Sequence, residues 1–282
     1  MNMNFKIASK YIQEQLSTIY SIREAQQISN LVLEDITHLT QTERLVAFEQ
    51  DLSPYQIHRL ENHLHQLKQH KPIQQVLGYA WFCGNKFFVN EHVLIPRPET
   101  EELIDLIINE NENTAINILD IGTGSGCIAI SLKKKIPLAN VTAIDISAFA
   151  LQVAHQNAEN LHQSINIKQL DFLNEESWIE LGNFDVLVSN PPYIKQSEQI
   201  EMAENVIKHE PHVALFVPDD DALIFYKKIA EFAKNHLRED GVIYVEINET
   251  LRKETAEVFT NKGFQTKIII DMQEKNRFIK AW

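Results

Sequence analysis

Four apolar segments between residues 116 and 189 each lead into a polar residue, and this pattern constrains the fold more than any other part of the chain. The segments are Ile116 to Leu119, Val141 to Ile144, Ile165 to Leu170 and Phe184 to Ser189. Short apolar runs that alternate with helical periodicity are typical of buried parallel strands. Because the carboxyl ends of parallel strands meet at one edge of a sheet, the polar residues should line a common crevice. The sequence therefore predicts an α/β fold with a doubly wound sheet.

The last of these segments is followed by Asn190-Pro191-Pro192-Tyr193. Two prolines fix the backbone φ angle and remove two N–H donors, so this stiff loop would present carbonyl oxygens and the Asn190 amide as acceptors. Two acceptors that bind the hydrogens of a substrate NH2 group favour the pyramidal nitrogen, whose lone pair can attack an electrophile. Alone, the tetrapeptide would be an ordinary turn. At the end of a buried strand it predicts chemistry at an unreactive nitrogen.

A glycine-rich loop, Asp120 to Gly126, follows the first segment and opens a helical pattern. Glycines at alternate positions let the backbone approach a ligand and turn into the helix. A dinucleotide fingerprint would need Gly or Ala at position 127, where this chain has Cys127, and that departure weakens a nicotinamide interpretation. The cofactor-binding candidates in this loop are Gly122, Thr123, Gly124, Ser125 and Gly126.

Two carboxylates complete the predicted crevice. Asp145 ends the second segment at about 20 residues beyond the loop, where an acid can accept hydrogen bonds from ribose hydroxyls. Asp171 ends the third, and Phe172 beside it offers an aromatic face for adenine. Each acid alone is more often a helix N-cap or a solvated side chain. The order of the motifs and the absence of a P-loop lysine indicate an adenosine pocket without a phosphate clamp, which S-adenosylmethionine fits best.

The chain before about residue 75 has helical periodicity and repeated capping signals. Ser21 with Glu24 and Thr40 with Glu43 form capping boxes, and Ser53 precedes a proline in the first turn. We predict a four-helix domain over residues 1–74. Its predicted core consists of Leu31, Val32, Leu45, Val46, Phe48, Ile57, Leu60, Leu64 and Leu67.

A β-hairpin linker is predicted over residues 75–95, with two aromatic runs about the turn pair Gly84-Asn85. The rigid, charged segment Leu94 to Leu103 follows and would either close over the cofactor or serve as a plain linker. The catalytic domain is predicted over residues 96–282. Two strand-like segments at its end, Phe264 to Asp271 and Arg277 to Trp282, favour an antiparallel strand in an otherwise parallel sheet.

Composition excludes several classes of function. The chain has 282 residues, 44% of them hydrophobic, and a formal net charge of -13, which opposes tight nonspecific binding to nucleic acid. Without a signal-peptide h-region or a run of about 20 apolar residues, we expect a cytoplasmic protein that binds no membrane. The 2 cysteines and 11 histidines form no zinc pattern, so no metal is expected.

Taken together, these motifs resemble the glutamine N5-methyltransferases that modify peptide chain release factors. The resemblance covers nearly the whole chain and includes the helical domain, the hairpin from Pro72 to Val93, the glycine loop and the proline loop. The glycine loop alone is shared by class I methyltransferases. The segment Arg97-Pro98-Glu99-Thr100-Glu101 together with the proline loop is more particular, because methyltransferases acting on nucleobases usually lack the former.

The resemblance implies a class I S-adenosylmethionine-dependent methyltransferase fold, a Rossmann-like doubly wound sheet with an antiparallel last strand. The implied activity is methylation of the side-chain amide of the glutamine in the Gly-Gly-Gln tripeptide of class 1 release factors. The implied catalytic residues are Asn190, Pro191, Pro192 and Tyr193, with the Asn190 Oδ1 and Pro191 carbonyl oxygens as acceptors. The implied cofactor contacts are Gly122 to Gly126, Asp145, Phe172 and Asn190. The helical domain would recognise the release factor, and a monomer without direct contact to nucleic acid is expected.

Three alternatives remain open at this stage. A related enzyme could methylate a glutamine of a ribosomal protein, an exocyclic-amine methyltransferase could act on nucleic acid, and a cofactor-binding module could lack catalysis.

One departure from the family pattern occurs at Asn248, where the family usually has glycine after Glu246-Ile247. Because asparagine tolerates left-handed backbone conformations, we expect the turn to be kept.

Overall fold

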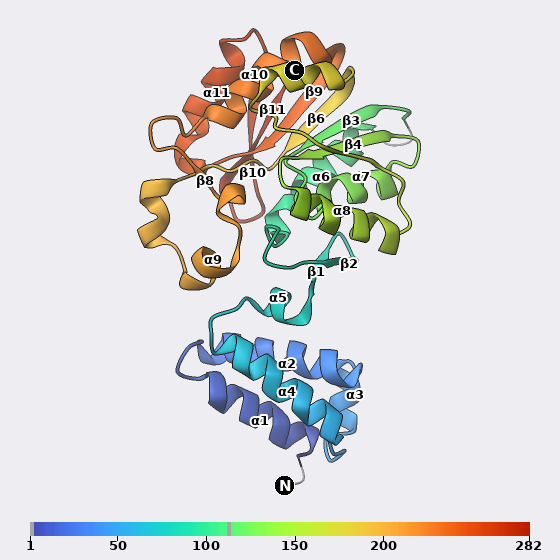
Figure 1. Cartoon of the computed structure of the whole chain (residues 1–282), viewed down its shortest axis with the longest axis vertical. Helices are drawn as coiled ribbons and strands as arrows, with labels where there is room; N and C mark the ends of the chain where they lie inside the picture. Colours follow the sequence, from blue (N-terminus) through green and yellow to red (C-terminus); the bar gives the residue numbers. More distant parts are fainter. Residues whose placement is uncertain (1–2, 112–113) are drawn as a thin grey trace. The chain divides into compact units, whose positions relative to one another are not determined.

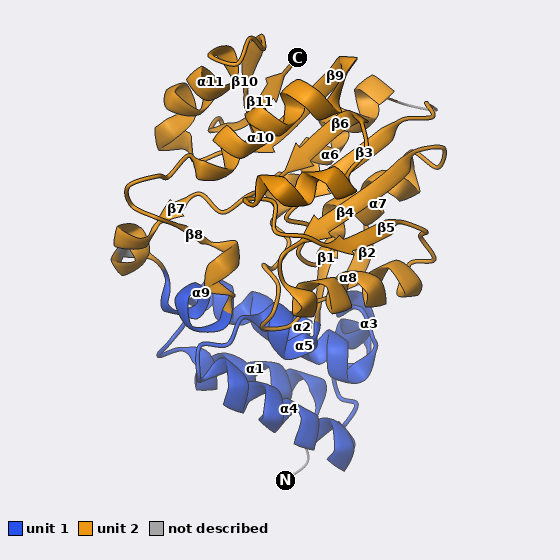
Figure 2. Ribbon diagram, turned by 45° about the horizontal axis from the view of Figure 1, so that its top comes forward, with its two compact units in different colours: residues 1–78, 203–209 blue, residues 79–202, 210–282 orange. Residues whose placement is uncertain are grey.

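The computed structural model describes residues 3–111 and 114–282, which form two compact units. The smaller unit comprises residues 1–78 and 203–209, and the larger comprises residues 79–202 and 210–282 (Figure 2). The smaller unit is therefore discontinuous in sequence, which the predicted division near residue 75 did not include.

The smaller unit is helical (Figure 1). Its helices are α1 (Phe5–Leu16), α2 (Ile22–Thr37), α3 (Gln41–Val46), α4 (Pro54–Leu67), α5 (Ile73–Leu77) and α9 (Glu204–His209). Complete capping boxes begin α3, at Thr40 and Glu43, and α4, at Ser53 and Gln56. At the start of α2 the Ser21 side chain accepts a hydrogen bond from the Glu24 N–H, which is the first half of the predicted box.

Buried aliphatic side chains from α1, α2 and α4 form the core of this unit. Of the predicted core residues, Val32, Leu60, Leu64 and Leu67 are buried. The prediction is wrong for three residues in and after α3, since Leu45, Val46 and Phe48 are 67%, 82% and 45% exposed. The six-residue α3 instead buries Arg44, whose guanidinium donates to the Leu39 and Asn30 carbonyls.

The larger unit begins with a hairpin formed by β1 (Tyr79–Phe82) and β2 (Asn85–Phe88). Phe82 pairs with Asn85, so the turn residues are Cys83 and Gly84 and not the predicted pair Gly84-Asn85. Both have positive φ angles, 46° and 71°, as a type I′ turn requires. The Asn85 side chain donates to the Cys83 carbonyl oxygen at 2.8 Å, which favours this unusual conformation of a cysteine.

A seven-stranded sheet with the order β10-β11-β9-β6-β3-β4-β5 forms the centre of the larger unit. Its strands are β3 (Asn117–Ile121), β4 (Asn140–Asp145), β5 (Asn166–Gln169), β6 (Phe184–Ser189), β9 (Leu237–Glu246), β10 (Thr266–Ile270) and β11 (Asn276–Ala281). The ladders joining β5, β4, β3, β6 and β9 are parallel. The last strand, β11, is antiparallel to both β9 and β10, which confirms the predicted arrangement.

Helices cover both faces of this sheet (Figure 1). They are α6 (Pro98–Asn111), α7 (Cys127–Lys135), α8 (Ala148–Asn160), α10 (Ile224–His236) and α11 (Arg252–Thr260), with two short strands, β7 (Ile194–Lys195) and β8 (Phe216–Val217), outside the sheet. Within residues 3–111 and 114–282, short 3-10 helices lie at Glu175–Glu180, Gln196–Glu201, His212–Ala214 and Glu249–Leu251.

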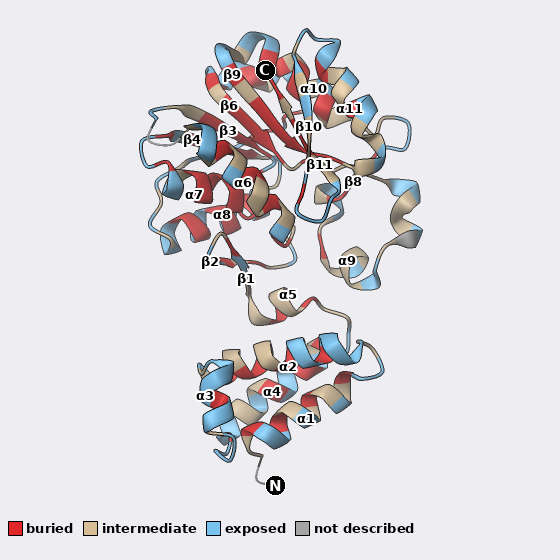
Figure 3. Ribbon diagram, turned by 180° about the vertical axis from the view of Figure 1, so that it is seen from behind, coloured by how far each residue is buried: buried red, intermediate tan, exposed pale blue. Residues whose placement is uncertain are grey.

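Alternating residues of the central strands pack on the two helical layers. In β3, Ile118 belongs to the cluster built by α6 and α7, whereas Leu119 belongs to the cluster built by α10 and α11. The central strands are accordingly buried along most of their length (Figure 3). Burial of both faces explains why these strands read as continuous apolar runs in the sequence.

The connections reverse direction at β3, because the chain passes from β3 to β4 on one side whereas β6 lies on the other. Such a point leaves a crevice outside the carboxyl ends of the strands, where ligands bind in open α/β sheets. The motifs at the ends of β3, β4 and β6 meet at this crevice. Among the residues that the structure describes, no helix is both long and apolar enough to cross a bilayer.

Candidate active site

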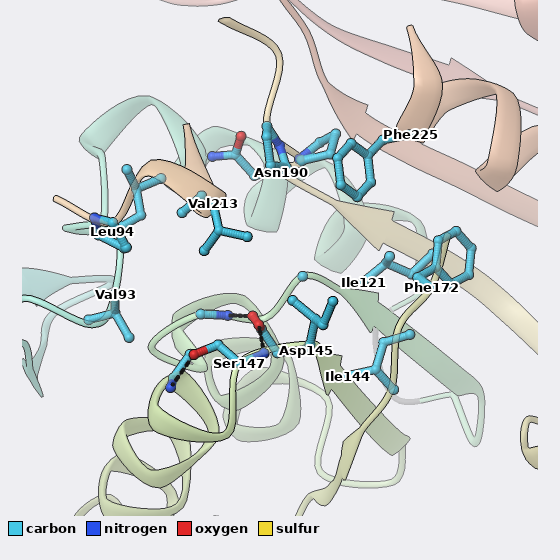
Figure 4. A pocket seen from close by; sticks show the side chains of 18 of the residues that line it. Val93, Leu94, Ile121, Ile144, Asp145, Ser147, Phe172, Asn190, Val213 and Phe225 are labelled. Atoms are coloured by element: carbon cyan, nitrogen blue, oxygen red, sulfur yellow. Dashed lines mark hydrogen bonds between the residues drawn. The ribbon is translucent and has the colours of Figure 1, made fainter. Parts of the chain in front are cut away.

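A cavity lies at the carboxyl ends of β3, β4 and β6 and contains about 900 Å³ of space between atoms, part of it open to solvent. Its lining is mostly apolar. In Figure 4, Asp145 and Ser147 lie on one side of the cavity and Asn190 and Phe225 on the other, while Val93, Leu94 and Val213 approach from a third side.

The glycine loop between β3 and α7 is held against the end of β4. The N–H groups of Gly122 and Thr123 both donate to the Ile144 carbonyl at 2.9 Å, and the Gly124 N–H donates to Asp145 Oδ2 at 2.9 Å. Gly122 and Gly124 have φ angles of 75° and 54°, a region that glycine enters without strain. Both line the cavity, whereas Thr123, Ser125 and Gly126 are absent from its described lining.

The third glycine of the loop serves helix packing. Gly126 precedes α7 with a φ angle of 79°, and a Cβ atom placed on it would lie 3.2 Å from the Ala154 Cβ atom of α8. Gly126 was predicted to be one of the cofactor contacts. The structure shows that its missing side chain allows the loop and α8 to approach each other.

The Asp145 carboxylate is positioned by backbone groups on both sides. Its Oδ2 atom accepts from Gly124, and its Oδ1 atom accepts from the Ser147 N–H at 2.9 Å, where α8 begins (Figure 4). Burial raises the pKa of Asp145, while these backbone hydrogen bonds act in the opposite direction. A carboxylate has about four lone-pair sites, so oxygens already holding two N–H groups can still accept two hydroxyl hydrogens.

A second acid lies beneath the loop and is absent from the described cavity lining. Asp120 is fully buried, and its Oδ2 atom accepts from the Thr123 hydroxyl at 2.6 Å and from the Ala129 N–H at 3.2 Å. Its Oδ1 atom has no hydrogen-bond partner among the described residues. Burial raises the pKa of Asp120 to about 7.

Phe172 lines the far end of the cavity and is itself fixed by other aromatic rings. Its ring packs edge-on against Phe232 with centroids 5.4 Å apart, and its carbonyl accepts from the Trp178 indole N–H at 2.9 Å. Asp171, beside it, also lines the cavity. This arrangement gives an apolar wall and one carboxylate at the end of the cavity opposite Val93 and Leu94.

The proline loop after β6 contributes three of its four residues to the cavity lining, Asn190, Pro191 and Pro192. Tyr193 is absent from that lining. Its hydroxyl instead donates to Glu246 Oε1 at 3.4 Å, and burial together with the charge of Glu246 raises the pKa of Tyr193. Its position indicates a structural contact with the end of β9.

Three residues near the site were not assigned a role from the sequence. The Asn190 amide nitrogen donates to Thr100 Oγ1 at 3.3 Å, and the Thr100 hydroxyl donates to Glu246 Oε2 at 2.7 Å. Burial raises the pKa of Glu246, while the hydrogen bond from Thr100 and the charge of Arg277 act in the opposite direction.

Asn157 of α8 joins the hairpin to the glycine loop, because its amide forms hydrogen bonds with the Phe88 N–H, the Phe88 carbonyl and the Ser125 carbonyl.

The segment Leu94 to Leu103 contributes to the cavity directly, through Leu94. It is tied to a second lining segment by Glu210, which is buried and precedes Pro211. Glu210 accepts from the Ile95 N–H at 3.1 Å and pairs with Arg97 at 2.7 Å. A plain linker does not account for these contacts, because Leu94 lines the cavity and Glu210 holds the segment against a second lining segment.

The turn after Glu246-Ile247 does not use a left-handed conformation of Asn248. Its φ angle is -70°, and its side chain caps the 3-10 helix Glu249–Leu251 by accepting from the Thr250 N–H at 3.0 Å. Asparagine is therefore used here as a cap and not as a substitute for glycine.

The residues present fit an adenosyl group with a cationic sulfonium. The cavity offers the Asp145 carboxylate, an apolar wall at Phe172 and the backbone of Gly122 and Gly124. No lysine or arginine occurs among the described residues that line it, so it lacks the cations that a nucleotide phosphate requires. These features favour S-adenosylmethionine over a nucleotide.

Comparison with protein families gives two matches. The model of the methyltransferase small domain matches residues 100–214, and that of the PrmC N-terminal domain matches residues 8–78. The chain is 43% identical to a release factor glutamine methyltransferase of Flavobacterium psychrophilum, over 94% of each protein. It is 41% identical to a protein of the same name from Bacteroides thetaiotaomicron, over 96% of this chain and 97% of that protein.

Among solved structures, a methyltransferase from Pyrococcus furiosus is similar with a TM-score of 0.52 and 18% sequence identity. The similarity covers 78% of this chain and 98% of that chain. At this identity the match shows the fold alone; together with the family model over residues 100–214, it confirms the predicted class I methyltransferase architecture.

Proposed function

This chain belongs to the family of release factor glutamine methyltransferases, and from that premise we propose that it methylates the glutamine side-chain nitrogen in the Gly-Gly-Gln tripeptide of class 1 release factors. S-adenosylmethionine is the methyl donor. When bound, it supplies an electrophilic methyl group on a sulfonium.

The observation that carries this proposal is the placement of the proline loop opposite Asp145 in one cavity. Asp145 would hold the ribose, with Phe172 against the adenine and Gly122 and Gly124 along the donor. Asn190 and Pro191 would then hold the substrate amide at the opposite wall. This division of the cavity brings an amide nitrogen and a methyl donor together.

The chain's own groups act on the nucleophile. An amide nitrogen is a poor nucleophile because its lone pair is delocalised into the carbonyl. Oxygens of Asn190 and Pro191 that accept its two N–H hydrogens favour the pyramidal nitrogen and stabilise the positive charge that develops there. The nitrogen gains the methyl group as the methyl carbon–sulfur bond breaks and its electron pair stays on sulfur, and one N–H proton is released to solvent. Positioning and electrostatics supply most of the rate in this scheme.

The proposal is tested with purified enzyme, an intact class 1 release factor and a deuterated methyl donor. Mass spectrometry of the Gly-Gly-Gln peptide should show one labelled methyl group on glutamine. A release factor with glutamine replaced by glutamate provides the matched control and should remain unlabelled. Label on the glutamate variant, or none on the native factor, would contradict the proposal.

The two alternative activities are separate arms of this experiment. A ribosomal-protein glutamine and a single-stranded oligonucleotide are supplied under the same conditions, and the release factor should be the preferred acceptor. Asn190→Ala should lower kcat by about 100-fold, as expected for loss of a preorganised polar contact. A non-catalytic module would show no turnover in any arm.

We propose that the helical unit contributes to recognition of the release factor. A groove in this unit is lined by the exposed apolar residues Leu45 and Phe48 and by Lys6 and Lys10, with no acid among its described lining residues. Leu45→Glu should raise KM for the release factor and leave KM for the methyl donor unchanged. Ile22→Glu, at an exposed position outside the groove, is the control.

We propose that the enzyme acts as a monomer. Its place of action is the cytoplasm, where release factors act.

A further inference from the structure

We propose that Thr100 and Glu246 are positioning residues that fix the direction of the Asn190 amide, so that its oxygen and not its NH2 group faces the substrate. This inference rests on the proposed function in one respect, namely that Asn190 accepts a hydrogen bond from the substrate amide. It assigns a role to two residues that are absent from the described lining of the cavity.

The three side chains come from three separate elements. Thr100 lies in the first turn of α6, Glu246 ends β9, and Asn190 follows β6. The Asn190 amide nitrogen lies 3.3 Å from Thr100 Oγ1, which lies 2.7 Å from Glu246 Oε2. Thr100 and Glu246 are each 2% exposed, so water does not compete for these hydrogen bonds.

The chemistry of the three groups gives the chain of hydrogen bonds a direction. A carboxylate has only acceptors, and a hydroxyl has one hydrogen. Because Thr100 donates that hydrogen to Glu246, its oxygen can offer only lone pairs to Asn190. Asn190 must therefore turn its NH2 group toward Thr100 and its Oδ1 atom the other way.

The direction matters because the two ends of an amide have nearly the same shape. A reversed Asn190 would place Oδ1 against the lone pairs of Thr100 and would present an NH2 group to the substrate NH2 group. Both contacts would then be repulsive. Packing alone does not prevent this reversal, whereas the hydroxyl of Thr100 does.

Glu246 is itself held in place by two tyrosines. The Tyr193 hydroxyl donates to its second carboxylate oxygen, Oε1, at 3.4 Å, and the buried Tyr226 hydroxyl donates to its backbone carbonyl at 2.9 Å. Glu246 therefore cannot turn away from Thr100 without losing a contact on its other oxygen. This role also accounts for Tyr193, which belongs to the proline loop but not to the described cavity lining.

The first test compares Thr100→Val, which keeps the shape and removes the hydroxyl, with Thr100→Ser, which restores it. Thr100→Val should lower kcat on the release factor about tenfold or more, with KM for the methyl donor unchanged, and Thr100→Ser should recover most of the rate. Thr255→Val is the matched control, because Thr255 of α11 is also buried and donates to the carbonyl of Leu251, the residue before that helix. A full rate in Thr100→Val would overturn the proposal.

A double-mutant cycle tests whether the two residues act through one group. Glu246→Gln should also lower kcat, and the variant carrying both substitutions should lose no more than the worse single variant. Multiplicative losses would show that Thr100 and Glu246 act independently, which contradicts the inference.

A nuclear magnetic resonance measurement reads the amide directly and does not depend on activity. The side-chain NH2 signals of Asn190, assigned by their absence in Asn190→Asp, should exchange slowly with solvent in the native protein and in Thr100→Ser. They should exchange faster in Thr100→Val, while Thr255→Val leaves them unchanged. Equal exchange in Thr100→Val and the native protein would overturn the inference, even if the chain methylated another acceptor. Failure of the native enzyme to methylate a release factor would contradict the proposed function alone.

Discussion

At the scale of single residues, two independent features, the backbone conformation and the close packing around it, disfavour a side chain at Gly126. Its φ angle of 79° disfavours any Cβ atom, and a Cβ would also lie 2.9 Å from the Ile130 Cδ1 atom and 3.2 Å from the Ala154 Cβ atom. We expect Gly126→Ala to lower the free energy of unfolding by about 1–3 kcal/mol in urea titrations. Gly263 has a φ angle of 94° but open space around it, so Gly263→Ala should lower the free energy of unfolding only by the cost of the strained φ angle. Equal losses in the two variants would show that packing against α8 is unimportant.

Asp120 gives the stability a dependence on pH. Burial raises its pKa to about 7, whereas an unfolded aspartate has a pKa of about 3.9. Between these values the native state holds a proton that the unfolded state has lost, so the stability it contributes is present at low pH and is lost as pH rises. This group alone should lower the free energy of unfolding by about 1.4 kcal/mol per pH unit in that window.

Asp120→Asn removes the titration and keeps an acceptor for Thr123. The variant should therefore lose less stability than the native protein between about pH 5 and about pH 7. Urea unfolding at several pH values measures both curves. Parallel curves would mean that Asp120 is ionised throughout this range.

Residues that follow a buried strand could be found from the sequence, because position along the chain is enough to identify them. Asp145, Phe172 and Asn190 all line the cavity as predicted. Thr100 and Glu246 could not be found, since they meet across 146 positions of sequence and each looks ordinary among its neighbours. Leu45 and Val46 misled the core prediction because apolar periodicity does not reveal that a helix is too short to bury both faces.

At the scale of secondary-structure elements, the hairpin and the glycine loop are joined by one side chain. Asn157 of α8 accepts from the Phe88 N–H at 2.6 Å and donates to the carbonyls of Phe88 and Ser125 at 3.0 Å and 2.9 Å. It thus extends the edge of β2 as a further strand would. The sequence contained no signal for this role, because asparagine in a helix is unremarkable.

Replacing Asn157 by alanine removes the partners of the part-buried Phe88 N–H and carbonyl and of the buried Ser125 carbonyl. We expect Asn157→Ala to lower the free energy of unfolding by about 3 kcal/mol and to speed hydrogen exchange at the Phe88 amide. Asn166→Ala, which loses one exposed hydrogen bond of 3.5 Å to Thr142, is the control and should change little. Unchanged exchange at Phe88 would refute the assigned role.

Strand identity and the antiparallel last strand were predictable because each depends on local pattern and chain order. The hairpin turn was predicted one residue too late, since Gly-Asn is a common turn pair whereas a cysteine with positive φ is not. Here the pairing of Phe82 with Asn85 and the Asn85 side chain together decide the register.

At the scale of the whole molecule, the formal net charge of -13 favours a protein substrate over a nucleic-acid substrate. Without a cation excess, few phosphates can be neutralised and few counterions released. We expect the Kd for single-stranded RNA, measured by fluorescence anisotropy at physiological salt, to be above about 0.1 mM. Tight binding that weakens steeply with salt would favour a nucleic-acid substrate.

The helical unit is assembled from two pieces of chain, residues 1–78 and 203–209. Within it, the Gln75 amide donates to the His209 carbonyl at 2.7 Å, and a His209 ring nitrogen lies 3.0 Å from the Gln69 carbonyl oxygen. A gene fragment that ends at residue 78 therefore lacks α9, which belongs to this unit. Grafting this unit onto a relative to redirect its choice of target therefore requires two gene segments, because exchange of residues 1–78 alone leaves the recipient's own α9 in place.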